Sequence, residues 1–168
     1  EHRGEKMLLD FGQTDRFIVN ARELGIDIES IKTAVLSHGH YDHADGLRFI
    51  KGKKLVCHPD CFVKRYSKET GRYDGVGISL EELSQNNEVI LTKEPYEIAE
   101  GIFFLGQVPR VNDFECKQFP TVLENSEKDE LFDDSALAVK TENGVVVIAG
   151  CAHSGICNII EYAKNVTG

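Results

Sequence analysis

Three histidines and an aspartate fall within the segment Ser37-His38-Gly39-His40-Tyr41-Asp42-His43. The segment directly follows residues 31–36, which are apolar and β-branched and therefore predict a buried strand. Side chains on an extended chain repeat every two residues, so His38 and His40 point the same way and can reach one metal ion. We interpret the cluster as a metal site at the end of a strand, in preference to a histidine-rich surface loop.

The remaining donors of the cluster predict a second ion. Asp42 and His43 stand at the start of the next predicted helix, from which they can face the same cavity from the other side. Imidazole and carboxylate donors with no required thiolate suit zinc, iron or manganese, and catalytic sites leave one coordination position open for water. We therefore expect two divalent ions, with zinc preferred over iron or manganese, and Asp42 as the catalytic base.

Predicted strands and helices alternate through the first part of the chain, which is typical of an α/β fold. We predict strands at 6–11, 31–36, 54–57, 88–91, 96–99, 102–105, 135–141 and 145–149, and helices at 16–24, 44–50, 59–66, 79–85 and 156–163. The Asn143-Gly144 pair between two apolar runs predicts a hairpin. Residues 106–134 predict a long loop or a lid. No linker divides the 168 residues, so we expect a single domain over 1–168.

The charge balance restricts the partners. The chain has 19 Lys and Arg against 28 Asp and Glu, a net charge of −9. Nucleic-acid binding needs a basic footprint, so we expect no nucleic-acid partner. The apolar runs are far shorter than the roughly 20 residues that span a bilayer, so we expect no membrane partner either. The partner that remains is a small-molecule substrate.

The cysteines indicate a reducing compartment. Five are scattered along the chain with no C-x-x-C pair, which fits reduced thiols and a cytoplasmic protein. Four of them we interpret as packing groups: Cys57, Cys61, Cys116 and Cys157.

Three cations stand in the predicted loop or lid: Arg110, Lys117 and Lys128. They could meet an anionic substrate, but we interpret them as exposed solubilising charges.

Three passages, in the same order, resemble the metallo-β-lactamase superfamily. Residues 37–47 resemble its H-x-H-x-D-H signature, residues 8–12 an earlier strand that ends in Asp-x-Gly, and residues 145–153 the strand before the next metal-binding histidine. A narrower resemblance is to the group related to 7,8-dihydropterin-6-methyl-4-(β-D-ribofuranosyl)-aminobenzene-5′-phosphate synthase. The residues that carry it are 36–43, 132–137 and 150–158.

The resemblance implies an αββα sandwich with mixed sheets face to face and metals at one sheet edge. It implies that His38, His40 and His153 form the first metal site and that Asp42 and His43 contribute to the second. Asp10 would accept a hydrogen bond from a ligand imidazole and fix its tautomer.

Some ligands that the resemblance implies stay unassigned. Asp134 and Cys151 are both candidates for a bridging ligand, with packing as the alternative for Cys151. No histidine follows His153 to complete the second site. The chain starts without Met and lacks strands that family members have at both ends, so we expect a fragment and an incomplete sandwich. An apolar sheet face exposed in this way would drive homodimerisation or contact with a partner.

The resemblance and the donor set together predict a metal-dependent hydrolase. It would attack a small anionic substrate, phosphorylated or pterin-related, through metal-activated water. The alternatives are a pterin-related transferase that uses the same metal site, a di-iron redox protein and a catalytically incomplete module. Substrate-binding residues are not identifiable from the sequence.

Overall fold

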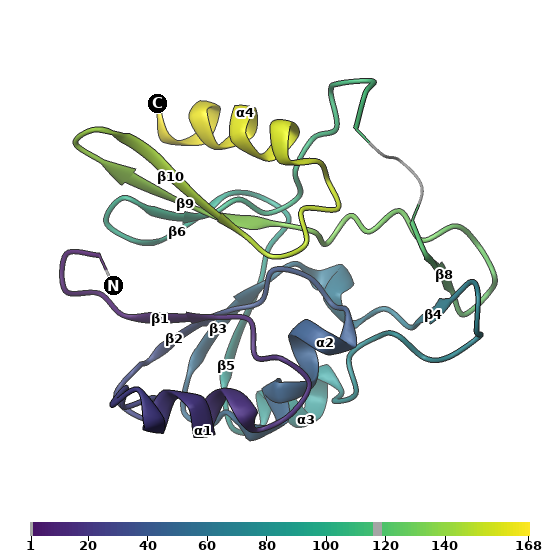
Figure 1. The fold of residues 1–168 in the computed structure, drawn as a ribbon, viewed down its shortest axis with the longest axis horizontal. Coiled ribbons are helices and arrows are strands. Elements are labelled where there is room, and N and C mark those ends of the chain that lie inside the picture. Colours follow the sequence, from purple (N-terminus) through teal and green to yellow (C-terminus); the bar gives the residue numbers. More distant parts are fainter. Residues whose placement is uncertain (1, 116–118) are drawn as a thin grey trace.

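The computed structural model describes residues 2–115 and 119–168, which build two four-stranded sheets stacked on each other with helices on both outer faces (Figure 1). This is the αββα sandwich that the sequence predicted. Cys116 and Lys117, for which the sequence suggested packing and solubilising roles, lie outside the described residues.

The first sheet is entirely parallel, in the order β1-β2-β3-β5. Its strands are β1 (Met7–Leu9), β2 (Thr33–Val35), β3 (Lys54–Cys57) and β5 (Glu88–Leu91). Parallel neighbours need crossover connections, and these carry the helices of the outer face. The helical segments are α1 (Arg16–Glu23), α2 (Tyr41–Ala44), the 3₁₀ turn Asp45–Phe49 and α3 (Leu80–Ser84). The helix predicted over 44–50 is thus almost entirely the 3₁₀ turn, and the short α2 precedes it.

The second sheet is antiparallel, in the order β10-β9-β7-β6. Its strands are β6 (Tyr96–Ala99), β7 (Ile102–Phe104), β9 (Ala136–Thr141) and β10 (Gly144–Ala149), and α4 (Ile156–Thr167) covers its outer face (Figure 1). The Asn143-Gly144 turn joins β9 to β10, as predicted. The prediction of mixed sheets is wrong. Crossover connections make the first sheet parallel, and short turns make the second sheet antiparallel. No described helix combines the length and apolar composition that crossing a bilayer requires.

Side chains that alternate along the strands divide the core into three apolar layers. Val35 and Val56 pack between the sheets against Phe104 and Leu137. Their neighbours Ala34, Leu36 and Leu55 face the opposite way and pack beneath the helices of the parallel sheet. On the other side, Ala136 and Ala138 of β9 pack against Ile159 and Ala163 of α4. Each sheet thus has apolar side chains packed on both faces, although Val146 and Ile148 of the edge strand β10 are exposed.

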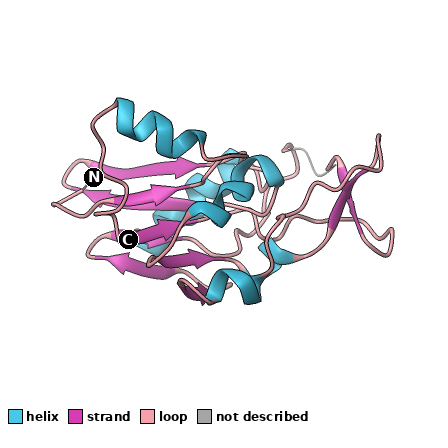
Figure 2. Ribbon diagram, turned by 90° about the horizontal axis from the view of Figure 1, so that it is seen from below, coloured by secondary structure: helices cyan, strands magenta, loops and turns pink. Residues whose placement is uncertain are grey.

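The predicted helix over 59–66 is wrong. Only Pro59–Phe62 forms a 3₁₀ turn, and the chain then enters β4 (Arg65–Ser67). This strand pairs antiparallel with β8 (Thr121–Leu123), which lies within the predicted loop. Figure 2 shows the resulting two-stranded ribbon set apart from the main sheets. The partner of β4 is distant in the chain, so the local pattern held no sign of the pairing.

Candidate metal centre

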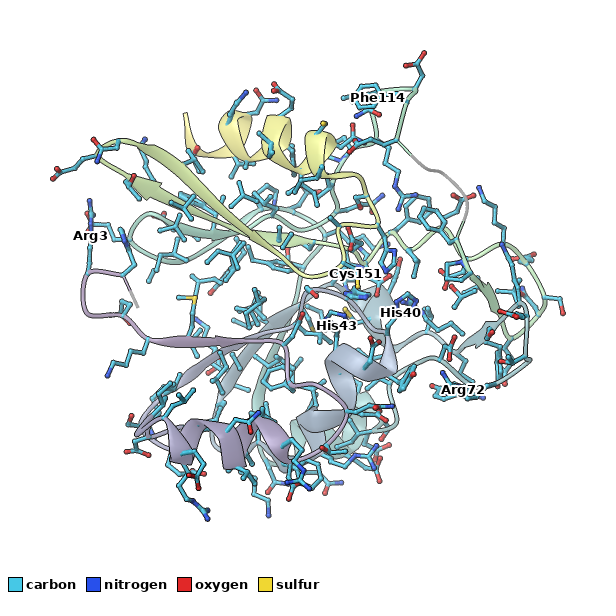
Figure 3. The ribbon with its side chains drawn as sticks, viewed as in Figure 1. Arg3, His40, His43, Arg72, Phe114 and Cys151 are labelled. Atoms are coloured by element: carbon cyan, nitrogen blue, oxygen red, sulfur yellow. The ribbon has the colours of Figure 1, made fainter. Side chains whose placement is uncertain are left out.

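The candidate site lies at one edge of the sandwich, where strands from both sheets end. Asp10 follows β1, the segment Ser37–His43 follows β2, and Cys151 and His153 follow β10. Carboxyl ends of parallel strands share one edge of a sheet, so the first two segments meet there. Figure 3 shows His40, His43 and Cys151 close together at this edge.

Four imidazole rings form the centre of the site. The ring centroid of His38 lies 4.8 Å from that of His40, 4.3 Å from that of His43 and 5.0 Å from that of His153. The His40 and His153 centroids are 4.9 Å apart. The structure therefore brings all four predicted histidine ligands together, although His153 is far from the others in the chain.

The donor atoms fit a metal ion. His38 Nε2 and His40 Nδ1 are 3.1 Å apart, close to the ~3.3 Å that separates two nitrogens around one tetrahedral zinc. Donor atoms of His38, Cys151 and His153 all lie within 4.8 Å of one another. The buried Nε2 atom of His153 has no hydrogen-bond partner among the described residues. Buried polar atoms are normally paired, so this nitrogen indicates room for a ligand such as a metal.

Asp10 orients the imidazole rings of His43 and His38 through hydrogen bonds. Its carboxylate accepts hydrogen bonds from the Ser37 backbone N–H and from Ser37 Oγ, each at 2.8 Å. Asp10 Oδ2 lies 2.7 Å from His43 Nδ1, and Ser37 Oγ lies 2.9 Å from His38 Nδ1. The carboxylate thus fixes the orientation of His43 directly and that of His38 through Ser37. Asp10 has a left-handed backbone (φ 57°), which costs little for Asp and turns the chain at the strand end.

Cys151 and Asp42 both lie next to His43. The Cys151 sulfur is 3.1 Å from His43 Nε2, and Asp42 Oδ2 is 3.8 Å from the same nitrogen. The Asp42 side chain is 54% exposed. Cys151 is also exposed, so the packing alternative for it is wrong. Cys157 is exposed as well, so that among the four described cysteines only Cys57 and Cys61 are buried as expected.

Asp134 supports the turn that carries His153. Its Oδ2 accepts a hydrogen bond from the Ser154 N–H at 2.7 Å, and its carbonyl oxygen accepts one from Ser154 Oγ. The other carboxylate oxygen is buried and has no partner among the described residues. These contacts place Asp134 beside the turn of His153, with one oxygen left for a further donor or ion.

A buried ion pair that the sequence did not single out fixes the loop between the two metal-motif histidines. Asp133 Oδ2 accepts the Gly39 N–H at 2.7 Å, and Arg65 binds both oxygens of the same carboxylate, at 3.1 and 3.0 Å. Arg65 and Asp133 are both 0% exposed. A Cβ atom at Gly39 would overlap the Cys61 carbonyl oxygen, so the loop also packs tightly from the other side. In the sequence, the adjacent residues Asp133 and Asp134 are only a weak indication of a functional site, and nothing marks Arg65.

Burial keeps the predicted first-site histidines neutral. It lowers the pKa values of His38 and His153, and it lowers the pKa of His40 to about 4. Neutral imidazoles have free lone pairs, as metal ligands require. His43 differs, because its hydrogen bond to Asp10 raises its pKa. Burial also raises the pKa of the Asp134 carboxyl and that of the Cys151 thiol.

A surface hollow of about 520 Å³ adjoins the histidines and is a candidate substrate position. Its walls include His153, Phe119 and Ile156. On another side of the motif, Arg72 lies 4.7 Å from the centre of the Tyr41 ring and donates a hydrogen bond to its hydroxyl at 2.8 Å.

The two described cations of the predicted lid are already paired. Arg110 packs over the Phe119 ring and donates to the Leu131 carbonyl oxygen, and its side chain is only 15% exposed. The prediction that Arg110 is an exposed solubilising charge is therefore wrong. Lys128 is exposed and pairs with Glu130 at 2.7 Å.

The comparisons with known proteins agree with this geometry. The family model of the metallo-beta-lactamase superfamily matches residues 1–59. MJ0448, an uncharacterized protein of Methanocaldococcus jannaschii, is 33% identical over 99% of this chain and 66% of its own length. The 7,8-dihydropterin-6-methyl-4-(beta-D-ribofuranosyl)-aminobenzene-5'-phosphate synthase of the same organism is 28% identical over 90% of this chain and 56% of its own length. The chain thus spans less than two thirds of each relative.

Solved structures show the same fold. A metal-dependent hydrolase of the beta-lactamase superfamily superposes with a TM-score of 0.80 at 34% identity, covering 96% of this chain and 66% of that one. An N-acyl homoserine lactone hydrolase superposes with a TM-score of 0.56 at 14% identity, covering 99% of this chain and 72% of that one, and at this identity the likeness concerns the fold alone. With its αββα layers, its histidine cluster and these matches, the chain belongs to the metallo-β-lactamase superfamily.

Proposed function

We propose that this chain is a metal-dependent hydrolase that acts on a small anionic substrate in the cytoplasm. His38, His40 and His153 would hold one divalent ion, and Asp42 and His43 would contribute to a second. The observation that carries the proposal is the convergence of four imidazoles at one edge of the sandwich, with buried ring nitrogens that lack partners. Zinc suits these donors best, with iron and manganese as alternatives.

Divalent ions at this site would polarise a substrate oxygen and make water a nucleophile near neutral pH. The half-exposed Asp42 carboxylate is within reach of solvent beside His43, where it can accept the proton of the attacking water. Asp10 holds His43 in one tautomer, and the buried Asp133 holds the backbone between His38 and His40. These contacts keep the donors in place before substrate arrives.

Two observations support an anionic, pterin-related substrate: the name of one relative, and one exposed arginine of this chain. The synthase of 28% identity has a 5'-phosphate compound in its name. In this chain, Arg72 lies against Tyr41, the residue before Asp42, and its side chain is 64% exposed. Its guanidinium also pairs with Asp74 at 3.3 Å and, being exposed, can meet a phosphate or carboxylate of a substrate. The hollow between Phe119 and Ile156 would take the less polar part of the substrate.

A transferase on the same metal site is the second candidate, because the named relative is a synthase. In that case Asp42 would accept the proton of an acceptor group instead of that of water. A di-iron redox protein and a catalytically incomplete module of the same fold are the remaining alternatives. Bound iron with an oxidation-dependent visible spectrum would identify the redox protein.

The proposal is tested first by elemental analysis of the freshly purified protein, with the His38→Ala/His40→Ala double variant as control. We expect near-stoichiometric zinc, iron or manganese that falls in the double variant. Hydrolysis is then assayed on phosphorylated and pterin-containing esters, with Asp42→Asn as the variant of the base. Metal no higher than in the double variant, even after reconstitution, contradicts the proposal. An Asp42→Asn protein with its metal and full activity removes Asp42 from the role of base.

Self-association is a separate proposal. The sheet-edge strand β10 exposes Val146 (51%) and Ile148 (44%). An edge strand with exposed apolar side chains is a surface on which another chain can pair, and a second copy would bury it.

A further inference from the structure

We propose that the Cys151 thiolate is itself a ligand of the metal centre and supplies the donor that the sequence left unassigned. This inference rests on the proposed metal site. It adds a thiolate to a set of donors that otherwise contains only imidazole and carboxylate. It also decides between the two residues that the sequence offered for this position, Cys151 and Asp134.

The sulfur lies among the donors of both predicted ions. It is 3.1 Å from Nε2 of His43, which belongs to the second set of ligands. It is also within 4.8 Å of the donor atoms of His38 and His153, which belong to the first set. Sulfur and nitrogen ligands of one tetrahedral zinc are separated by ~3.6 Å, so a small shift of the side chain brings Cys151 and His43 onto one ion.

The metal centre contains a buried ring nitrogen that no described protein group binds. The buried Nε2 atom of His153, a ligand of the first predicted ion, has no hydrogen-bond partner among the described residues. Asp134 also keeps one buried carboxylate oxygen without a partner among the described residues, but the group of donor atoms that lie within 4.8 Å of one another contains Cys151, with His38 and His153, and not Asp134. Cys151 is therefore the better placed of the two residues to act as a ligand.

The backbone is built to present the sulfur. Ala152, between Cys151 and His153, has a left-handed conformation (φ 56°) that is rare for alanine. This turn lets Cys151 and His153 both contribute to the site. Gly150, before it, leaves no room for a side chain, because a Cβ atom there would overlap Ser37 Oγ. The end of β10 is thus pressed against the same Ser37 and Asp10 that orient His38 and His43. Strain of this kind at a strand end often accompanies function.

Binding is a simple exchange of a proton for a metal ion. The S–H bond of Cys151 breaks, its proton goes to solvent, and a sulfur–metal bond forms with no change in oxidation state. Thiolates favour zinc over manganese, so Cys151 would bias the centre toward zinc. Loss of the sulfur should lower zinc affinity by at least about 10- to 100-fold, the loss found when a group that only supports a ligand is removed, and should affect manganese less.

Cobalt(II) gives a direct readout of the bond. The metal-free protein is titrated with Co²⁺ under anaerobic conditions, and bound cobalt is counted by mass spectrometry. We expect a near-ultraviolet sulfur-to-cobalt charge-transfer band that grows with bound cobalt in the natural protein and in Cys157→Ser, and that is absent from Cys151→Ser. Cys157 is the matched control, because it is also exposed and lies six residues further along the chain.

Alkylation by iodoacetamide supplies a second measurement. Metal-free protein should be modified at both Cys151 and Cys157, and cobalt should protect Cys151 alone. A Cys151→Asp variant, which keeps a charged donor, should bind cobalt without the band and shows that loss of the band is not loss of the fold.

The outcomes separate this inference from the proposed function. Bound cobalt without a charge-transfer band in the natural protein overturns the role of Cys151 and leaves the metal centre intact. A band that persists in Cys151→Ser, or Cys151 that is alkylated equally with and without cobalt, also overturns it. No bound cobalt at all overturns both proposals.

Discussion

Asp133→Asn is the sharpest test of how the metal loop is held. Asp133 is 0% exposed and accepts three hydrogen bonds, one from the Gly39 N–H and two from Arg65. An asparagine of the same shape has one acceptor and one donor group. Either orientation turns its NH₂ toward Arg65, and one of them also turns it toward Gly39. The buried guanidinium then keeps one charged partner among the described residues, Asp129, whose Oδ2 is 3.3 Å from Arg65 Nε, and its hydrogen bond to the Asp60 carbonyl oxygen.

Breaking one partner of a buried ion pair typically costs about 3–5 kcal/mol, so we expect the free energy of unfolding to fall by that amount. The assay is urea unfolding of the metal-free protein, followed by metal titration. Glu124→Gln is the control, because it breaks the exposed pair of Glu124 with Lys64 (2.8 Å), which contributes little. We also expect weaker metal binding in Asp133→Asn only, because Gly39 lies between His38 and His40. A stability loss no larger than that of the control would refute this account.

Two further predictions concern the same loop. Burial lowers the pKa of His40 from 6.5 to about 4, so the unfolded chain takes up the proton first and stability is lost as pH falls through this range. Each pKa unit corresponds to about 1.36 kcal/mol, so the free energy of unfolding lost through His40 approaches about 3 kcal/mol near pH 4. The raised pKa of His43 offsets part of this loss. Urea unfolding of metal-free protein from about pH 7 to about pH 4.5 checks this, and a flat profile contradicts it. Gly39→Ala should destabilise the chain severely by the overlap with the Cys61 carbonyl, whereas Gly52→Ala, which meets no neighbour, should cost less by thermal unfolding. Equal melting temperatures for the two variants would argue against a tight loop.

Local residue patterns were sufficient to predict the buried strands and the histidine cluster, whereas the αββα layers followed from the family resemblance. Val35 and Val56 face one side of the parallel sheet, and their neighbours Ala34 and Leu55 face the other. Strands that are buried on both faces are apolar throughout, so they are recognisable from composition alone. The spacing of His38 and His40 predicts a shared direction without any long-range contact. Both predictions depend only on near neighbours in the chain, which is why the sequence was enough.

Features that depend on distant partners were not predictable. The strand β4 exists because β8 pairs with it, and Arg65 is buried because Asp133 and Asp129 neutralise it. Nothing near Arg65 in the sequence marks it as buried, since an arginine before a tyrosine and a serine is usually exposed. In the same way, the exposure of Cys151 follows from the left-handed turn at Ala152, which the sequence does not reveal.

The unpaired atoms of the site connect its stability to its chemistry. His40 and His153 each bury a ring nitrogen without a partner, and Asp134 buries a carboxylate oxygen. Leaving one such group unpaired costs about 1–3 kcal/mol, so the metal-free fold tolerates a loss that is large relative to the stability of a typical domain. The buried Arg65–Asp133 pair and the two packed sheets keep the loops in place despite this loss. A metal ion bound by His153 Nε2 or by the free Asp134 oxygen would remove part of this penalty, so that metal binding and folding stabilise each other. The same unpaired donors that weaken the metal-free protein are therefore what makes the site ready to bind metal.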